Sequence, residues 1–455
     1  NADRQYAGTT DSPVFEKSEV MGHNLTATLD TDFGELKSTT AFRQLTWEDS
    51  LDLDGSPLPL ANTMRLTDYD SFSQEVQLAG QAGALNYVFG AYYFKDDGFT
   101  DNPQTFFGGA SVFDSRAGFT TNAKAVYGQL EYAVTDALTL IGGLRYTDEK
   151  KTIDRANIAV VFQGLPPNTP FVPEGTTAEA KFDDLSPQIT VAYKASENVN
   201  LYAKFAKGFK SGGFNGEAGS VAETVRPYDA ETIKSFEAGA KTRFWDNRAQ
   251  INLSAFVNKH EDMQLSVFTA QGAAASDVRN AGRATIKGIE FEGLLQASDT
   301  FLLRTNIGLL DPEYKEFIEF GTDVSDDRAF PHAPKMTASA GFDWDFLSGK
   351  FGQLTLSGDA NHSAKYHTFP YALSETAPQP ASNTLAPART IVDARIAWTD
   401  LPGAFEGVEV AVWAKNLGDT EYLTNFIDFG PGFGGLTNGY YGQPRTYGMT
   451  LAMDF

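Results

Sequence analysis

The feature that most constrains this chain is an alternation of apolar and polar residues with a period of two, repeated over segments of about ten residues. The C-terminal segment shows it best, because one parity is large and apolar: Tyr447, Met449, Leu451, Met453 and Phe455. The residues between them are small or polar. Similar alternation occurs within 138–147, 235–244, 251–258, 336–344 and 392–398. Each segment is typical of a β-strand with one apolar and one polar face.

The connections between these segments alternate strictly between short and long. Short connections fall at 32–35, 80–84, 134–137, 195–198, 245–248, 297–300, 347–351 and 400–407. Long connections fall near 48–70, 96–122, 150–180, 210–231, 270–280, 312–332, 368–388 and 417–442. Aromatic residues gather near segment ends, where a bilayer interface favours Tyr and Trp: Tyr132, Tyr146, Phe244, Trp245, Trp344 and Trp398. These patterns predict an all-β fold, a transmembrane antiparallel β-barrel, rather than a soluble sandwich.

The number of segments indicates a partial barrel. We count about seventeen strands, whereas bacterial barrels close with an even number. If the C-terminus is periplasmic, the first strand, near 21–31, runs towards the periplasm and would be the sixth of about 22. We therefore expect residues 1–455 to be the C-terminal portion of a barrel lacking about five strands. Residues 1–20 would end an extracellular loop. The chain starts at Asn1 without a signal peptide, which predicts processing or a longer parent protein.

Composition excludes several classes of function. The net charge of -23 argues against a nucleic-acid partner, because phosphate binding requires a basic face. The absence of cysteine excludes disulfides, cysteine–zinc sites and thiol nucleophiles. No run of about 18 apolar residues is present, which excludes a transmembrane helix but not a barrel.

Motifs of catalysis and metal binding are missing. There is no Gly-x-Ser-x-Gly segment, and His260-Glu261 lacks the second histidine of a zinc protease motif. The 5 histidines are scattered, so we predict no catalytic residue, no metal site and no cofactor. The acidic loop 49–55 resembles half of a calcium loop, but Ala61 stands where the bidentate Glu belongs. Turn chemistry is therefore the preferred interpretation of this loop.

Three groups of motif residues stand out along the chain. The first is Gly208, Phe209, Lys210, Ser211, Gly212, Gly213, Phe214 and Asn215, which follows Leu-Tyr-Ala-Lys at 201–204. The second is the segment 414–419, which centres on Asn416. The third is the closing strand, with Pro444, Arg445 and the terminal Phe455. Together with the segments 73–78, 231–241 and 280–290, their order and spacing resemble the barrel of TonB-dependent receptors over nearly the whole chain.

This resemblance implies an importer in the bacterial outer membrane. The family's barrel has about 22 strands and encloses an N-terminal plug preceded by a TonB box, neither of which is visible here. The implied partners are the TonB–ExbB–ExbD energising complex, reached through the missing plug, and outer-membrane lipid and lipopolysaccharide. The implied ligand is a scarce nutrient, most commonly a ferric siderophore, with haem, cobalamin and carbohydrates as alternatives. We expect no enzymatic activity.

The long loops are rich in aromatic residues and glycine, which favours a receptor over a pore. We expect ligand contacts from Phe214, Tyr366, Tyr440 and Tyr441, because aromatic side chains offer large contact areas at low entropic cost. Loop aromatics that only pack against one another are the alternative. Two rival functions stay open: a passive porin-like channel and, with less support, an outer-membrane barrel enzyme.

Overall fold

A computed structural model describes residues 10–270, 274–280, 282–319, 321–374, 384–401, 403, 407–428 and 437–453. One antiparallel sheet of 19 strands dominates it, and strands that follow one another in sequence pair with each other. Seventeen strands remain when the short β5 and β16 are left out of the 19, as the alternation predicts. They are β1 (Phe15–Thr31), β2 (Gly34–Asp52), β3 (Ala61–Ala82), β4 (Leu85–Asp101), β6 (Ser111–Ala133), β7 (Leu138–Val161), β8 (Thr169–Ser196), β9 (Val199–Lys210), β10 (Glu231–Phe244), β11 (Ala249–Glu261), β14 (Gly282–Ser298), β15 (Phe301–Glu319), β17 (Met336–Gly349), β18 (Gly352–Ser363), β21 (Arg389–Thr399), β22 (Val408–Lys415) and β25 (Thr446–Met453).

The long connections contain short elements of their own. Two strands extend the main sheet, β5 (Gln104–Phe106) and β16 (Thr322–Asp323). Three hairpins stand apart from it: β12 (Gln264–Ala270) with β13 (Ala274–Asn280), β19 (Tyr366–His367) with β20 (Leu385–Ala386), and β23 (Leu423–Asp428) with β24 (Thr437–Tyr441). The helical turns are η1 (Phe107–Gly109), α1 (Val221–Thr224) and η2 (Ser325–Asp327).

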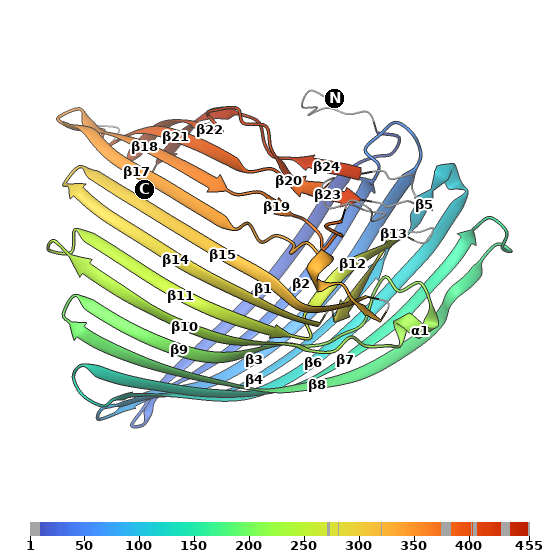
Figure 1. The fold of residues 1–455 in the computed structure, drawn as a ribbon, viewed down its shortest axis with the longest axis horizontal. Coiled ribbons are helices and arrows are strands. Elements are labelled where there is room, and N and C mark those ends of the chain that lie inside the picture. The colour runs from blue at the N-terminus through green and yellow to red at the C-terminus, as the bar shows by residue number, and fades with distance from the viewer. Residues whose placement is uncertain are drawn as a thin grey trace.

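The main sheet wraps into a strongly curved wall (Figure 1). Tight hairpin turns gather at the left end in this view, while α1 and the small hairpins lie towards the other end. Among the described residues, β1 pairs only with β2 and β25 only with β22, so these two strands form the edges of the sheet. We call the two ends of the wall the short-turn end and the long-loop end.

Each of the eight predicted short connections joins two paired strands, and seven of them are confirmed as turns, whereas 400–407 lies partly outside the described residues. For example, β6 ends at Ala133 and β7 begins at Leu138. The first turn requires glycine, because Gly34 has a φ of 120°. A Cβ at Gly34 would also lie 2.2 Å from the carbonyl oxygen of Ala79 on the next strand. Only glycine accepts both the dihedral angle and this approach.

Three of the predicted long loops, 48–70, 96–122 and 150–180, are largely strands of the main sheet. A fourth, 270–280, belongs largely to β13 of a separate hairpin, so the expectation of a loop is corrected for all four. We take 150–180 as the example. In this range, β7 and β8 have 24 and 28 residues and pair as far as Ala159 and Thr169. The apolar alternation ends near Tyr146, because outward residues beyond it are polar, such as Asp148 and Lys150. The backbone ladder continues regardless, since it does not depend on side-chain polarity. At about 3.3 Å per residue, such strands extend far beyond a hydrocarbon core of about 30 Å.

The two faces of the wall differ in polarity. Large apolar side chains are exposed on one parity of successive strands, including Val126, Leu144, Leu185, Ile189, Leu253, Ile289, Ile396 and Val412. An exposed apolar band of this kind on a sheet is the surface that a bilayer covers. No helix in the described ranges is long and apolar enough to cross a membrane.

The opposite parity carries a network of polar side chains. Tyr127 donates a hydrogen bond to Glu75 over 2.7 Å, and Arg145 lies 5.6 Å from the Tyr127 ring. Further along the wall, Arg304 pairs with Asp343 and Arg395 pairs with Glu409. This inner face is therefore hydrated and internally paired, as predicted for the lumen side of a barrel.

Candidate functional site

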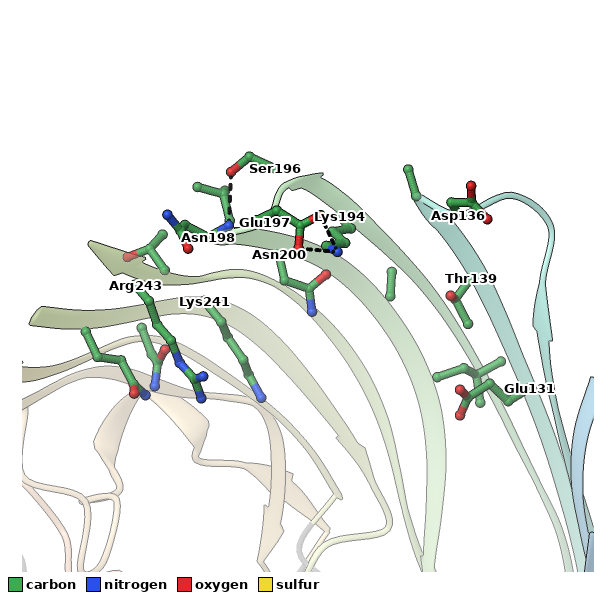
Figure 2. A pocket seen from close by; sticks show the side chains of 17 residues that line it. Glu131, Asp136, Thr139, Lys194, Ser196, Glu197, Asn198, Asn200, Lys241 and Arg243 are labelled. Atoms are coloured by element: carbon green, nitrogen blue, oxygen red, sulfur yellow. Dashed lines mark hydrogen bonds and ion pairs between the residues drawn. The ribbon is translucent and has the colours of Figure 1, made fainter. Parts of the chain in front are cut away.

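A cavity of about 520 Å³ lies on the inner face at the short-turn end, between β6 and β11. Figure 2 shows Lys241 and Arg243 extending side by side from β10, with Glu131 across the cavity. Lys194 instead holds Glu197 at 2.7 Å within the adjoining turn. None of the lining residues is aromatic. This cavity is therefore a polar part of the inner face and lacks the aromatic lining predicted for the ligand contacts.

The first motif, 208–215, forms the junction between β9 and the loop 211–230 at the long-loop end. Gly208, Phe209 and Lys210 pair with β10, and Gly213 then forms an isolated bridge with Tyr228. A Cβ at Gly212 would lie 2.3 Å from the carbonyl oxygen of Tyr228 and 2.3 Å from the Phe182 ring. Burial raises the pKa of the Tyr228 hydroxyl. The glycines thus permit a close crossing of two chain segments.

Asn215 fastens the same junction to the β12–β13 hairpin. Its side-chain oxygen accepts from Val278 N at 2.7 Å, and its amide donates to Val278 O at 3.3 Å. Ser211 contributes a carbonyl that accepts from the Gln264 side chain at 3.0 Å. The first motif is therefore an anchoring element of the long-loop end. No ligand role for its residues follows from these contacts.

The loop 211–230 folds over the inner face of β6, β7 and β8. Gly216 approaches Phe119 on β6, and Arg155 on β7 donates to Ala218 O at 3.4 Å. Arg155 also donates to Arg116 O at 2.9 Å and to Ala156 O at 2.5 Å, and is only 2% exposed. Arg155 is a structural residue that the sequence pattern did not indicate, because it falls within the range predicted as a loop and belongs to no motif.

A carboxylate cluster borders this junction. The Glu231 carboxylate contacts His260 Nδ1 at 2.8 Å and accepts from Gln264 N at 3.0 Å. Nearby, burial and the carboxylates of Asp229, Glu261 and Glu316 raise the pKa of Asp262, which lies in the turn after β11. This part of the long-loop end thus carries negative charge that is unfavourable for an anionic ligand.

Of the four predicted ligand-contacting aromatics, Phe214 is the least accessible. It is 8% exposed and lies within the anchored junction, so a ligand reaches it only if this loop moves. Tyr440 and Tyr441 lie on β24 and are 45% and 40% exposed, respectively. Their role in ligand contact stays a prediction, and the accessible pair fits it better than Phe214.

Tyr366, the fourth of these aromatics, belongs to a compact group. Its hydroxyl donates to Thr424 O at 2.9 Å and accepts from Arg389 Nη1 at 3.4 Å. The Arg389 guanidinium lies 5.4 Å from the Tyr366 ring and 5.2 Å from the Tyr422 ring. The His332 ring lies 5.9 Å from the Tyr366 ring. The sequence analysis identified Tyr366 but not Arg389, Tyr422 or His332, which come from three other segments.

Most other loop aromatics pack against one another. Phe106 and Phe113 form a buried cluster with Ala61 and Ala159, covered by Phe162 and Phe171. Tyr314, Phe317 and Leu265 form a second cluster, against which Phe330 packs, and Tyr371 with Phe369 belongs to a third. For these residues the structure favours the alternative interpretation, in which aromatics fold the loops themselves.

The second and third motifs meet where β22 and β25 leave the sheet. The Asn416 amide donates to Thr420 O at 2.9 Å and to Gln443 O at 3.1 Å, and its side-chain oxygen accepts from Thr420 N at 2.8 Å. Arg445 N donates to the Asp419 carboxylate at 3.0 Å. We call this group the Asn416 clamp. Pro444 lies in the sequence between Gln443 and Arg445, which both belong to this group. Phe455 lies outside the described residues.

The acidic loop 49–55 is held together by turn hydrogen bonds. Asp52 accepts from Gly55 N at 3.0 Å, and Asp54 accepts from Ser56 N at 3.1 Å and Ala61 N at 2.9 Å. The preferred interpretation as turn chemistry is therefore confirmed. Within the ranges described above, no group of three His, Asp or Glu side chains is arranged to hold a metal ion.

Comparison with known proteins places this fold in a family. Residues 1–417 match the family model described as TonB dependent receptor-like, beta-barrel. The pesticin receptor of Yersinia pestis is 22% identical over 342 residues, 75% of this chain and 45% of that protein. The ferrioxamine B receptor of Salmonella typhimurium is 23% identical over 242 residues, 53% of this chain and 31% of that protein. The chain thus spans less than half the length of these relatives.

A solved structure shows the same architecture. The ferric yersiniabactin uptake receptor FyuA of Yersinia pestis superposes with a TM-score of 0.80 at 18% identity, over 99% of this chain and 63% of that one. The proteins named here are receptors and not enzymes. From the extent of the family match, this chain belongs to the TonB-dependent receptor-like β-barrel family.

Proposed function

We propose that this chain forms the barrel wall of an outer-membrane receptor that takes up a ferric siderophore in a TonB-coupled way. The observation that carries the proposal is the family match over residues 1–417, on a curved wall with an exposed apolar band and a polar inner face. Two of these relatives are named for ferrioxamine B and ferric yersiniabactin, which supports a ferric chelate as the ligand class.

The proposed partners follow from the same family membership. Energy would come from TonB with ExbB–ExbD, through a plug domain that the resemblance predicts outside this chain. The apolar band would face outer-membrane lipid, and the charged strand extensions beyond it would lie at the level of lipopolysaccharide. The long-loop end would capture the ligand outside the cell, and the protein would release it by a gated conformational change.

The experiment that tests this function is uptake of radioactive iron. The complete gene product is expressed in a strain that lacks its own siderophore receptors, and uptake of ferric yersiniabactin, ferric citrate and ferrioxamine B is measured. We expect uptake of at least one chelate that stops when TonB is deleted or a protonophore is added. Uptake that persists without TonB would favour the passive channel, and no uptake of any chelate would contradict the proposal.

A further inference from the structure

Arg389, Tyr366 and Tyr422 form a cationic site on the inner face at the long-loop end; we call it the Arg389 site. Arg389 is the first residue of β21 and shares its parity with Arg395, which pairs with Glu409 on the inner face. The opposite parity of β21 carries the exposed apolar residues Val392 and Ile396. The guanidinium of Arg389 is therefore directed towards the lumen rather than the lipid.

Both tyrosine rings are held in place by contacts outside the site. The Tyr366 hydroxyl donates to Thr424 O at 2.9 Å, and its backbone pairs with Ala386. Tyr422 O accepts from Gly442 N at 2.8 Å, and a Cβ at Gly442 would lie 1.9 Å from the Tyr422 ring. The close ring position thus requires glycine at position 442. The site is preorganised, because the two rings do not depend on Arg389 for their position.

Arg389 differs from two arginines with which it can be compared, Arg328 and Arg395, whereas Arg145 on β7 resembles it, since its guanidinium lies 5.7 Å and 5.6 Å from the Tyr92 and Tyr127 rings. Arg328, also at the long-loop end, pairs with Glu319 and Asp327, and Arg395 on the same strand pairs with Glu409. No ion pair joins Arg389 to a carboxylate in the described part of the chain. The Tyr366 and Tyr422 rings lie 5.4 Å and 5.2 Å from its guanidinium carbon, and its hydrogen bond to the Tyr366 hydroxyl is long at 3.4 Å. The chain has a net charge of -23, yet this cation pairs with none of its described carboxylates. The Arg389 guanidinium is therefore available to an external anion.

A guanidinium beside aromatic rings has a defined chemistry. The rings attract its charge, and its planar set of N–H donors matches a pair of anionic oxygens in a bidentate manner. Aromatic stacking also displaces water from the cation, which strengthens such a hydrogen bond. Carboxylates and catecholates present paired anionic oxygens of this kind. A chelate whose exposed group is an ammonium has no favourable partner at this position.

We propose that the Arg389 site binds the anionic oxygen pair of a ferric chelate, and that it makes the receptor prefer carboxylate or catecholate chelates over cationic ones. This inference rests on the proposed function and specifies its ligand class. Arg389 acts as the specificity-determining donor. Tyr366 and Tyr422 hold the guanidinium by cation–π contacts, and Gly442 allows the position of Tyr422.

The test measures equilibrium binding of three chelates to the complete, detergent-purified receptor by fluorescence quenching. Ferric citrate presents carboxylates, a ferric tris-catecholate presents catecholates, and ferrioxamine B carries a free ammonium. Arg389→Met removes the charge and keeps the aliphatic stem, and Arg389→Lys keeps the charge without the planar fork. Lys365→Met is the matched control, because it removes one exposed positive charge beside Tyr366. Folding of each variant is checked by the shift in gel mobility on heating.

We expect the wild type to bind at least one anionic chelate more tightly than ferrioxamine B. Arg389→Met should weaken that binding by about 10- to 100-fold, as expected for loss of a charge-assisted bidentate contact. The affinities of Arg389→Lys and Gly442→Ala should lie between those of the wild type and Arg389→Met. The affinity of Lys365→Met should remain within about twofold of the wild type, since exposed charges contribute little. The two anionic probes show whether carboxylate or catecholate is the better partner.

Several results would overturn the inference. They are a wild-type preference for ferrioxamine B, an unchanged affinity in folded Arg389→Met, and an equal loss in Lys365→Met. If folded Arg389→Met lost affinity for all three chelates alike, Arg389 would have a general role and not a selective one. These outcomes leave TonB-coupled uptake intact. Failure of the wild type to bind or import any ferric chelate would instead remove the proposed function, and the inference with it.

Discussion

Two sectors of the inner face at the long-loop end are built in opposite ways. The covered sector consists of β6, β7 and β8 with the loop 211–230 upon them, and its Arg155 is buried and donates to backbone carbonyls. The open sector consists of β18, β21 and β22 with the Arg389 site, where the arginine is half-buried and stacks on aromatic rings. One arginine completes the fold, whereas the other retains hydrogen-bond donors for a partner.

The contrast separates structural aromatics from available ones. In the covered sector, the Phe119 and Phe182 rings pack closely against glycines of the loop 211–230, so these rings are not available to a ligand. In the open sector, Tyr366 and Tyr422 are half-buried and hold a cation between them. Aromatic richness in a loop is therefore a weak guide to ligand contact until the partners of each ring are known.

The largest expected effect is that of Arg155→Met in the covered sector. Three backbone carbonyls, of Arg116, Ala156 and Ala218, would lose a charged donor inside a buried site. We expect the local free energy of opening of the loop 211–230 to fall by about 3 kcal/mol. Amide hydrogen exchange of this loop measures the change. Arg389→Met is the control and should alter exchange there by less than about 0.5 kcal/mol. Equal effects of the two variants would remove the distinction between the sectors.

The next effect belongs to the Asn416 clamp in the open sector. Asn416→Ala removes three side-chain hydrogen bonds that join Thr420 and Gln443. We expect a loss of about 2 kcal/mol in the stability of the contact between 416–420 and 443–445, since the Asn416 side chain is buried and its hydrogen bonds are partly buried. Limited proteolysis within the segment 416–445, compared with the wild type, measures the loss. Leu417→Ala is a suitable control because Leu417 is exposed. If Asn416→Ala is cleaved no faster than this control, the clamp does not hold the Tyr422 loop.

A smaller effect is expected for Gly212→Ala. The added methyl group would meet Tyr228 O and the Phe182 ring at 2.3 Å, so the loop must shift away from the wall. Overpacking of this kind costs about 1–3 kcal/mol, and we expect the lower half of that range because a loop can yield. Gly219→Ala in the same loop is the matched control, since its Cβ would have no neighbour closer than 3.9 Å. Exchange protection of Tyr228 reports the result, and indistinguishable variants would refute a tight crossing.

Much of the wall could be predicted from sequence, because its physical cause is local. Alternation over 138–147 fixes which side chains of β7 face lipid, and turn residues such as Asp246 and Asn247 mark the hairpins. Strand ends could not be predicted in the same way. Beyond Tyr146 the ladder of β7 continues in polar sequence, where only pairing with β6 and β8 maintains it.

The candidate site was less predictable, because it is assembled from distant segments. Tyr366 was predicted as a loop aromatic. The contacts of Arg389 with Tyr366 and Tyr422 could not be predicted, because they form only where the chain after β18, the start of β21 and the loop after β22 come together. The motif residues Asn215 and Asn416 stood out for their family pattern, yet their contacts are with backbone groups. A motif seen in sequence identifies a constrained position without revealing whether folding or binding constrains it.

The smallest expected effect concerns an exposed anchor, Asp323 in the loop between β15 and β17. Hydrogen bonds from Phe317 N at 3.1 Å and Ser325 N at 3.0 Å lower the pKa of its carboxyl, and Arg283 adds a weaker attraction. Because the folded pKa lies below the unfolded one, the stabilisation is present above a pH of about 4 and is lost as the pH falls through the folded value. We expect exchange protection of Phe317 and Ser325 to decline slightly in acid, and this decline to vanish in Asp323→Asn. A decline of the same size in Asp323→Asn would assign the pH dependence to another group. A decline as large as the effect of Arg155→Met would contradict the view that buried contacts, rather than exposed ones, hold the loops on the wall.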